Sequence, residues 1–170
     1  MIRSALLACL LALGLAGCAT VQRYDAAADV HALLVAIRDN DRATFDAHVD
    51  KAALKRQIEA RLVAETRSAP VREEWKALGM LLAQPAASLA GDLLVRPQVF
   101  RAAAEYYGYA PTTPIPSSLV IAQQLRYTGD ARVCATRSKT GPCLLTFTRE
   151  GEHWRLSGFE GELSELRLKP

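Results

Sequence analysis

The chain has 170 residues, 50% of them hydrophobic, and a formal net charge of +3, which suits one domain with its own core. Basic and acidic residues are interspersed, without the basic stripe of a nucleic-acid footprint, so we expect no nucleic-acid partner. No metal-ligand spacing, phosphate loop or nucleophile elbow occurs. We therefore predict no catalytic residue, no metal and no cofactor.

The first 18 residues have the form of a bacterial lipoprotein leader. Arg3 supplies a positive start, Ala5–Leu15 is an apolar run, and Leu15-Ala16-Gly17-Cys18 has the form of a lipobox. The run is shorter than the roughly 20 residues that span a bilayer as a helix. We therefore predict that residues 1–17 are a cleaved signal peptide and that Cys18 carries the lipid that binds the membrane.

The residue after the cysteine is Ala19, so the Asp that signals retention in the inner membrane is absent. The resemblance to Gram-negative lipoproteins implies the periplasmic face of the outer membrane rather than the inner membrane. Residues 18–24 form a short lipidated tether in this interpretation, and residues 25–170 form a single domain close to the membrane.

The predicted export of the chain assigns different roles to its four cysteines. Cys9 leaves with the signal peptide and Cys18 is acylated, which leaves Cys134 and Cys143 as an even pair in an oxidising compartment. We predict a disulfide across the base of a hairpin, worth roughly 2–3 kcal/mol by loop entropy. A reactive thiol pair or half of a metal site are the alternatives, but no C-x-x-C motif and no nearby histidine supports them.

Helical periodicity dominates up to a Pro-rich segment, Pro111–Ser118. Asp25 is the predicted N-cap of the first helix, whose apolar face includes Val30 and Leu33, and Asp39-Asn40-Asp41 ends it. Further helices are predicted over Arg42–His48, from a cap at Asp50 through Leu62, over Pro70–Leu82, over Ser88–Val95 and over Pro97–Tyr107. One or two further helical turns follow at Ser118–Gln124.

After residue 124 the pattern changes to short β-rich segments. The predicted strands are Leu125–Thr128, Arg132–Thr136, Cys143–Arg149 and His153–Phe159. Hairpin turns are predicted at Gly129-Asp130 and at Glu150-Gly151.

The second turn predicts a register. It places Phe147 opposite Trp154 and Leu145 opposite Leu156, with all four side chains on one face. Cys143 then falls on that face, away from Cys134. A bulge in the 132–136 strand, or a sheet covered on both faces, would resolve this conflict, and the sequence does not decide between them.

Together these elements predict an α+β fold: an N-terminal helical half of four to five helices packed on a C-terminal antiparallel sheet of three to four strands. The chain also resembles an uncharacterised bacterial family, domain of unknown function 2939 (DUF2939). The resemblance is carried by Leu33–Leu62, with Ala36–Asp41, Val49-Asp50, Leu54, Lys55 and Ile58 inside it, and by the hairpin Phe147–Leu156. It implies a helix-plus-sheet domain of the NTF2-like or cystatin-like kind and transfers no active site.

Candidate site residues have structural interpretations in most cases. His31, His48 and His153 are far apart in sequence, and the neighbouring carboxylates Glu73-Glu74 and Asp39/Asp41 suit helix termini. Three tyrosines beside the Pro-rich segment are candidates for the rim of a ligand or partner groove: Tyr106, Tyr107 and Tyr109.

The leading functional hypothesis is a non-enzymatic, membrane-anchored lipoprotein that binds an envelope protein or a small apolar ligand. The alternatives are a periplasmic hydrolase with a site assembled from dispersed carboxylates and histidines, and a structural envelope protein. A pocket holding titratable groups within hydrogen-bond reach would favour the enzyme, and a groove without them would favour the binding protein.

Overall fold

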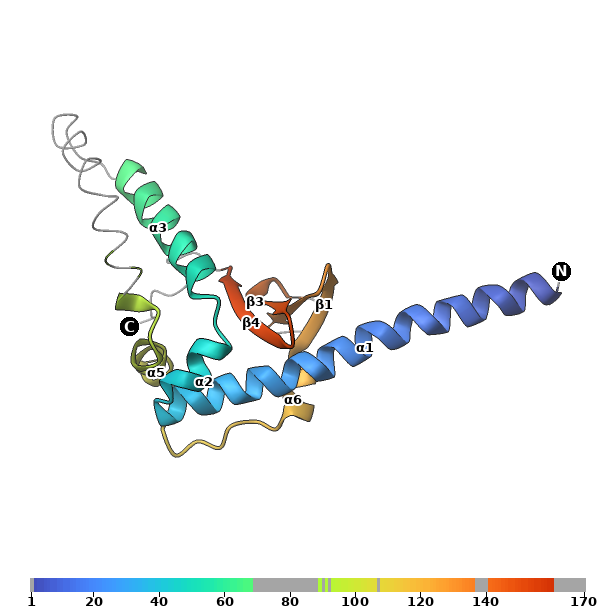
Figure 1. Cartoon of the computed structure of the whole chain (residues 1–170), viewed down its shortest axis with the longest axis horizontal. Coiled ribbons are helices and arrows are strands. Elements are labelled where there is room, and N and C mark those ends of the chain that lie inside the picture. The colour runs from blue at the N-terminus through green and yellow to red at the C-terminus, as the bar shows by residue number, and fades with distance from the viewer. Residues whose placement is uncertain are drawn as a thin grey trace. The chain divides into compact units, whose positions relative to one another are not determined.

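The computed structural model describes residues 2–68, 89, 91, 93–106, 108–136 and 141–160, with side chains described from residue 19 onward except at 65–68. The described helices are α1 (Ile2–Asp39), α2 (Arg42–Ala47), α3 (Lys51–Ser68), α5 (Pro97–Tyr106) and α6 (Ser118–Gln124). The strands are β1 (Leu125–Gly129), β2 (Arg132–Thr136), β3 (Cys143–Glu150) and β4 (His153–Phe159) (Figure 1). The α+β class is confirmed.

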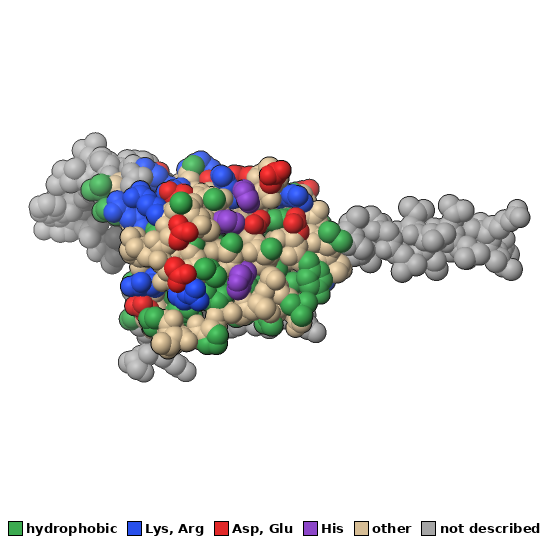
Figure 2. Space-filling view, turned by 60° about the horizontal axis from the view of Figure 1, so that its bottom comes forward, with side chains coloured by type: hydrophobic (Ala, Val, Ile, Leu, Met, Phe, Trp, Pro, Cys, Tyr) green, Lys and Arg blue, Asp and Glu red, His purple; other side chains and the backbone are tan. Residues whose placement is uncertain are grey.

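The chain forms two compact units. The first unit combines Met1–Ala32 with Ile115–Pro170, and the second unit is Leu33–Pro114. The first unit therefore holds the sheet, α6 and most of α1, whereas the second holds the end of α1 with α2, α3 and α5. On the face shown in Figure 2, hydrophobic and charged side chains are interspersed.

The first unit is built on an antiparallel meander with strand order β1-β2-β3-β4. All four strands were predicted to within one residue at each end. The predicted turns each lie one residue too early. Asp130 and Ala131 form the first turn, both with positive φ (49° and 53°), and Gly151 begins the second with φ 63°. Two consecutive positive φ values suit the right-handed twist of a tight hairpin.

The shifted second turn changes the predicted register of β3 and β4. Phe147 pairs with Leu156, and Trp154 pairs with Arg149. Phe147, Trp154 and Leu156 still lie on one buried face, because moving the turn by one residue changes each pairing by two and side chains alternate with a period of two. Leu145 departs from the prediction: it pairs with Phe159, beyond a register shift, and is 38% exposed.

A bulge resolves the conflict over the cysteines, and it lies in β3 rather than in the 132–136 strand. Ala135 pairs with Leu145 and Thr136 pairs with Cys143, so Leu144 has no partner across the β2–β3 ladder. The extra residue reverses the side on which Cys143 lies, so that it shares a face with Cys134.

Helix α1 contradicts the predicted start at Asp25. The helix is continuous from Ile2, so residues 18–24 are helical and Asp25 lies well inside it. The apolar residues upstream extend the helix, and no cap is needed where no helix begins. Its end was predicted correctly at Asp39, where Asn40 takes the left-handed conformation (φ 56°). Within the described residues, no helix is long and apolar enough to cross a membrane.

The second unit is organised by helix caps and an aromatic pair. Asp41 caps α2 through Ala43 N and Thr44 N, and Asp50 accepts a hydrogen bond from Ala53 N at 2.9 Å. Phe45 is fully buried, and its ring meets Phe100 edge-on with centroids 5.3 Å apart. The predicted helix at Pro70–Leu82 lies outside the described residues, and the segment Ser88–Val95 is described only in part.

Candidate functional site

The second unit contains a groove of about 710 Å³, which we name the basic groove. The two caps that start α2 and α3 also position its walls, because both helices begin next to it. Its basic and acidic lining residues are Arg42 and Asp46 from α2, Lys51 and Lys55 from α3, and Arg96 before α5. Among the lining residues that the structure describes, four cationic side chains and one carboxylate give an excess of three positive charges.

The carboxylate of the basic groove is engaged by its neighbours. Lys51 Nζ lies 2.5 Å from Asp46 Oδ1, and Arg42 Nε lies 3.9 Å from Asp46 Oδ2. Lys55 Nζ lies 4.0 Å from Glu59, which does not line the groove. Asp46 therefore neutralises only part of the positive charge, and the lining favours an anion.

One wall of the basic groove is apolar. Leu93, Val95, Pro97 and Val99 line it; Val95 and Pro97 are buried and Leu93 is 47% exposed. Gly91 brings its segment close to α3: a Cβ at this position would lie 2.8 Å from Lys55 Cγ. An apolar wall beside cationic side chains suits a ligand with an anionic head and an apolar body.

Hydrogen bonds shift the pKa values of three groups at the turn between α1 and α2. Hydrogen bonds from the Thr44 hydroxyl (2.6 Å) and the Thr44 N–H (3.2 Å) lower the pKa of Asp41 below its ordinary 3.8. Two hydrogen bonds from the Arg38 guanidinium, at 2.7 and 2.9 Å, lower the pKa of Asp39 and raise that of Arg38. These carboxylates orient the turn and cap α2, as the sequence indicated.

The three tyrosines predicted to rim a groove are not among the described residues that line the basic groove. Tyr106 is 65% exposed at the end of α5. The Tyr109 hydroxyl donates to Thr113 O at 3.2 Å and so fastens the Pro-rich segment. Tyr107 lies outside the described residues, and a role for the three tyrosines in binding stays a prediction.

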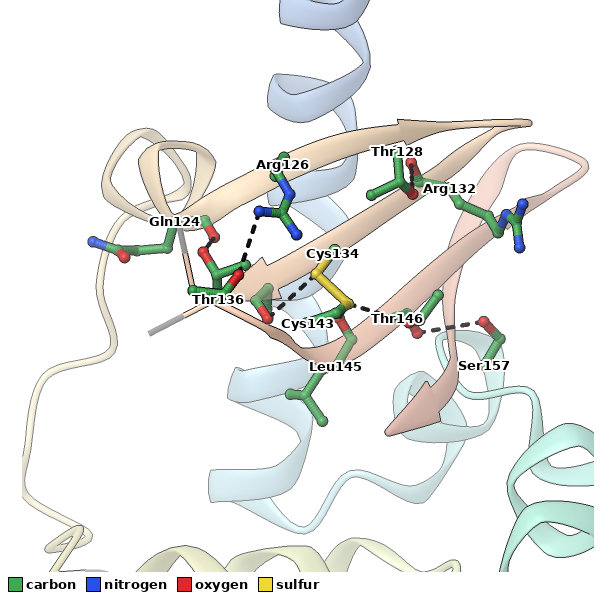
Figure 3. Close-up of a disulfide and its surroundings, with 12 residues drawn as sticks. Gln124, Arg126, Thr128, Arg132, Cys134, Thr136, Cys143, Leu145, Thr146 and Ser157 are labelled. Atoms are coloured by element: carbon green, nitrogen blue, oxygen red, sulfur yellow. Dashed lines mark hydrogen bonds between the residues drawn. A yellow bond between two sulfur atoms is a disulfide. The ribbon is translucent and has the colours of Figure 1, made fainter. Parts of the chain in front are cut away.

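The predicted disulfide is present. Cys134 and Cys143 join β2 to β3, with their Cα atoms 5.5 Å apart (Figure 3). Cys134 is fully buried, and the Thr146 hydroxyl lies 3.5 Å from Cys143 Sγ. The bond closes the base of the second hairpin of the meander. The side chain of Cys18 lies outside the described part of the chain, so its lipidation stays a prediction.

A polar junction that the sequence did not predict joins α1 to β4. Asp29 Oδ2 accepts a hydrogen bond from Trp154 N at 2.7 Å, and Asp25 Oδ2 accepts one from Trp154 Nε1 at 3.0 Å. Asp25 also pairs with Arg149 at 3.1 Å. The spacing of four residues places both carboxylates on one face of α1. This spacing is visible in the sequence, but it does not identify β4 as the strand that the carboxylates contact.

Each of the three histidines lies close to a polar group. His31 Nδ1 lies 2.9 Å from Pro116 O, which links α1 to the Pro-rich segment within the first unit. His48 Nδ1 lies 2.8 Å from Thr44 O at the end of α2. His153 Nδ1 lies 3.7 Å from Asp29 Oδ1.

A family model described as Protein of unknown function (DUF2939) matches residues 11–103 of the chain. The match covers more than half of the 170 residues and includes the stretch Leu33–Leu62 that carries the resemblance. The hairpin Phe147–Leu156, which we had also assigned to the family pattern, lies outside it. Neither a curated protein nor a solved structure matches the chain.

Proposed function

We propose that this chain, which belongs to the DUF2939 family, is a lipid-anchored binding protein of the bacterial envelope whose basic groove takes a small amphipathic anion. The proposed class of ligand rests on one observation: the described lining combines four cations and one carboxylate with an apolar wall. The cations would attract a phosphate or carboxylate head, and the wall formed by Leu93 and Val99 would accept its apolar body.

The envelope location is supported by the lipobox that ends at Cys18 and by the Cys134–Cys143 disulfide. Disulfides persist in oxidising compartments such as the periplasm and are rare in the cytosol. With Ala19 after the cysteine, the outer membrane is the favoured site of anchoring.

The composition of the lining favours binding over catalysis. Among the described residues that line the basic groove, there is no serine, threonine, cysteine or histidine to act as a nucleophile or proton carrier. Asp46, its carboxylate, is engaged by Lys51. A hydrolase of dispersed carboxylates and histidines would need a better-equipped cavity.

Three probes test the ligand class by isothermal titration calorimetry. Octyl phosphate carries both an anionic head and an apolar body, octanol lacks the head, and inorganic phosphate lacks the body. We expect octyl phosphate to bind at least about tenfold more tightly than either of the others, because each wall contributes on the order of 1 kcal/mol or more. Equal binding of octanol and octyl phosphate would contradict an anion site.

Substitutions locate the binding in the basic groove. Arg42→Gln combined with Arg96→Gln removes two lining cations, and we expect octyl phosphate to bind about tenfold more weakly. The matched control is Arg101→Gln, which removes an α5 cation that pairs with Glu105 at 3.2 Å and does not line the groove. An equal loss in both variants would exclude the basic groove as the site.

The anchor is tested by mass spectrometry of the protein purified from membranes. We expect a mature chain that begins at an acylated Cys18, and palmitate labelling that Cys18→Ser abolishes. An intact Met1 or an unmodified Cys18 thiol would overturn this part of the proposal.

A further inference from the structure

A second groove lies in the first unit, directly after the predicted lipid attachment. It measures about 440 Å³ and is formed by the segment of α1 from Ala19 to Arg23, the end of α6, and β1, with Thr136 from β2. Because its lining begins one residue after Cys18, a lipid on that cysteine would place this groove next to the membrane. We name the groove and the exposed residues around it the anchor-proximal surface.

The charges of the anchor-proximal groove are of one sign. Arg23 and Arg126 line it, together with Gln123 and Gln124, and no carboxylate is among the lining residues that the structure describes. Arg126 is exposed and donates to Gly141 O at 3.3 Å. In the part of the chain that the structure describes, neither arginine forms an ion pair with a carboxylate. Among the described residues, no carboxylate therefore offsets these two guanidinium groups.

Exposed apolar side chains flank these arginines. On α6, Leu119 is 57% exposed and Val120 is 46% exposed. They lie one helical turn before Gln123 and Gln124 and so extend the same face. Two further residues are exposed on α1 within two turns of Cys18: Val21 at 66% and Tyr24 at 46%. Hydrophobic side chains are visible beside the N-terminal part of α1 in Figure 2.

The geometry of α1 indicates how deep the anchor-proximal surface would lie in the bilayer. A rise of about 1.5 Å per residue places Arg23 about 7.5 Å along α1 from Cys18. The headgroup region on each side of a bilayer is roughly 5–8 Å thick. With α1 along the membrane normal, Arg23 would lie at the outer edge of the headgroup region, where its long side chain reaches the phospholipid phosphates, and Val21, about 4.5 Å from Cys18, would lie within that region.

We propose that the anchor-proximal surface docks on the membrane and that Arg23 and Arg126 bind the phosphate of anionic phospholipids. The proposal rests on the lipid anchor of the proposed function. Docking would hold the first unit against the bilayer in a fixed orientation, which a lipid on Cys18 alone would not do. Basic side chains near an anionic surface supply the attraction, and the exposed α6 side chains supply apolar contact.

A tryptophan reporter tests the docking in the lipidated full-length mature protein. Leu119→Trp places a reporter on α6, and Glu152→Trp places one on the exposed β3–β4 turn of the same unit, outside the groove lining, as a reference. Each protein is reconstituted in vesicles of phosphatidylcholine brominated near the headgroup end of its acyl chains, with and without phosphatidylglycerol. The fluorescence of the reporter-free chain is subtracted. We expect bromine to quench the Leu119→Trp reporter more strongly, and phosphatidylglycerol to increase that quenching.

Charge removal identifies the groups responsible. In the Leu119→Trp protein, Arg23→Gln with Arg126→Gln should abolish the increase caused by phosphatidylglycerol. Arg101→Gln with Arg132→Gln removes the same charge from cations that pair with Glu105 and Asp130, and should leave the increase intact.

The outcomes separate this inference from the proposed function. An acylated, vesicle-bound protein whose two reporters are quenched equally would overturn the docking alone. Quenching without dependence on phosphatidylglycerol would overturn the phosphate-binding role of the arginines. An unmodified Cys18 would overturn both the anchor and the docking that rests on it.

Discussion

The two units are held together by contacts of different range. In the first unit, Trp154 on β4 is bonded to Asp25 and Asp29 on α1, more than a hundred residues away, and a covalent bond joins β2 to β3. In the second unit, Asp41 and Asp50 cap helices that begin at the next residue. The long-range contacts tie α1 to the sheet in the first unit, whereas the caps of the second unit set where α2 and α3 begin beside the basic groove.

The largest effect should appear on truncating the largest fully buried side chain of the first unit. Trp154 is fully buried, so Trp154→Ala should lower the free energy of unfolding by about 3–5 kcal/mol. Leu145→Ala, on the neighbouring strand at 38% exposure, is the control and should cost much less. Urea unfolding followed by circular dichroism measures both, and similar losses would contradict the assigned core.

The disulfide should contribute the next largest effect, and only in the first unit. Replacing Cys134 and Cys143 by alanine should cost roughly 2–3 kcal/mol, because the bond restricts the loop between them in the unfolded chain. Reductant should lower the melting temperature of the native protein and leave that of the double variant unchanged. Octyl phosphate binding should survive in both, since the basic groove contains neither cysteine.

The polar junction should be worth less than the disulfide. Asp29→Ala removes the acceptor that lies 2.7 Å from Trp154 N and should cost about 1–3 kcal/mol. Asp29→Asn keeps an acceptor oxygen and should recover most of that loss. Equal destabilisation by both variants in urea would show that the charge of Asp29, rather than its hydrogen bond, holds α1 to β4.

Much of the fold follows from local patterns in the sequence. β-rich composition between turn residues located the four strands, and the caps Asp41 and Asp50 located α2 and α3, because these signals act within a few residues. The disulfide between Cys134 and Cys143 was predicted from the oxidising compartment and from the short spacing of the two cysteines. The first turn was misplaced by one residue because Asp130-Ala131 accepts two positive φ values without a glycine at either position.

The polar junction and the basic groove could not be predicted from such local patterns. Asp25 resembles a cap only if the helix begins there, and the apolar segment upstream extends α1 instead. The basic groove gathers Arg42, Lys55 and Arg96 from three segments. Each of these cations looks in the sequence like part of a solvated helix face, and only the tertiary fold brings them to one surface.

The smallest expected effect concerns the caps of the second unit and depends on pH. The hydrogen bonds of Thr44 lower the pKa of Asp41, so the ionised carboxylate stabilises the folded state. That contribution is complete above the ordinary pKa of 3.8 and is lost as the pH falls through the lower folded pKa. We expect melting temperatures of the native protein to decrease in this acidic range.

Two substitutions at Asp41 separate the cap from its charge. Asn is as good an N-cap as Asp but does not titrate, so Asp41→Asn should reduce the acid-dependent decrease in melting temperature. Asp41→Ala lacks the acceptor and should melt at a lower temperature than the native protein at neutral pH. Some acid dependence should persist in both, because Arg38 also lowers the pKa of Asp39. If Asp41→Asn keeps the full decrease, the acid sensitivity does not come from the cap of α2 and must come from other carboxylates, such as Asp39.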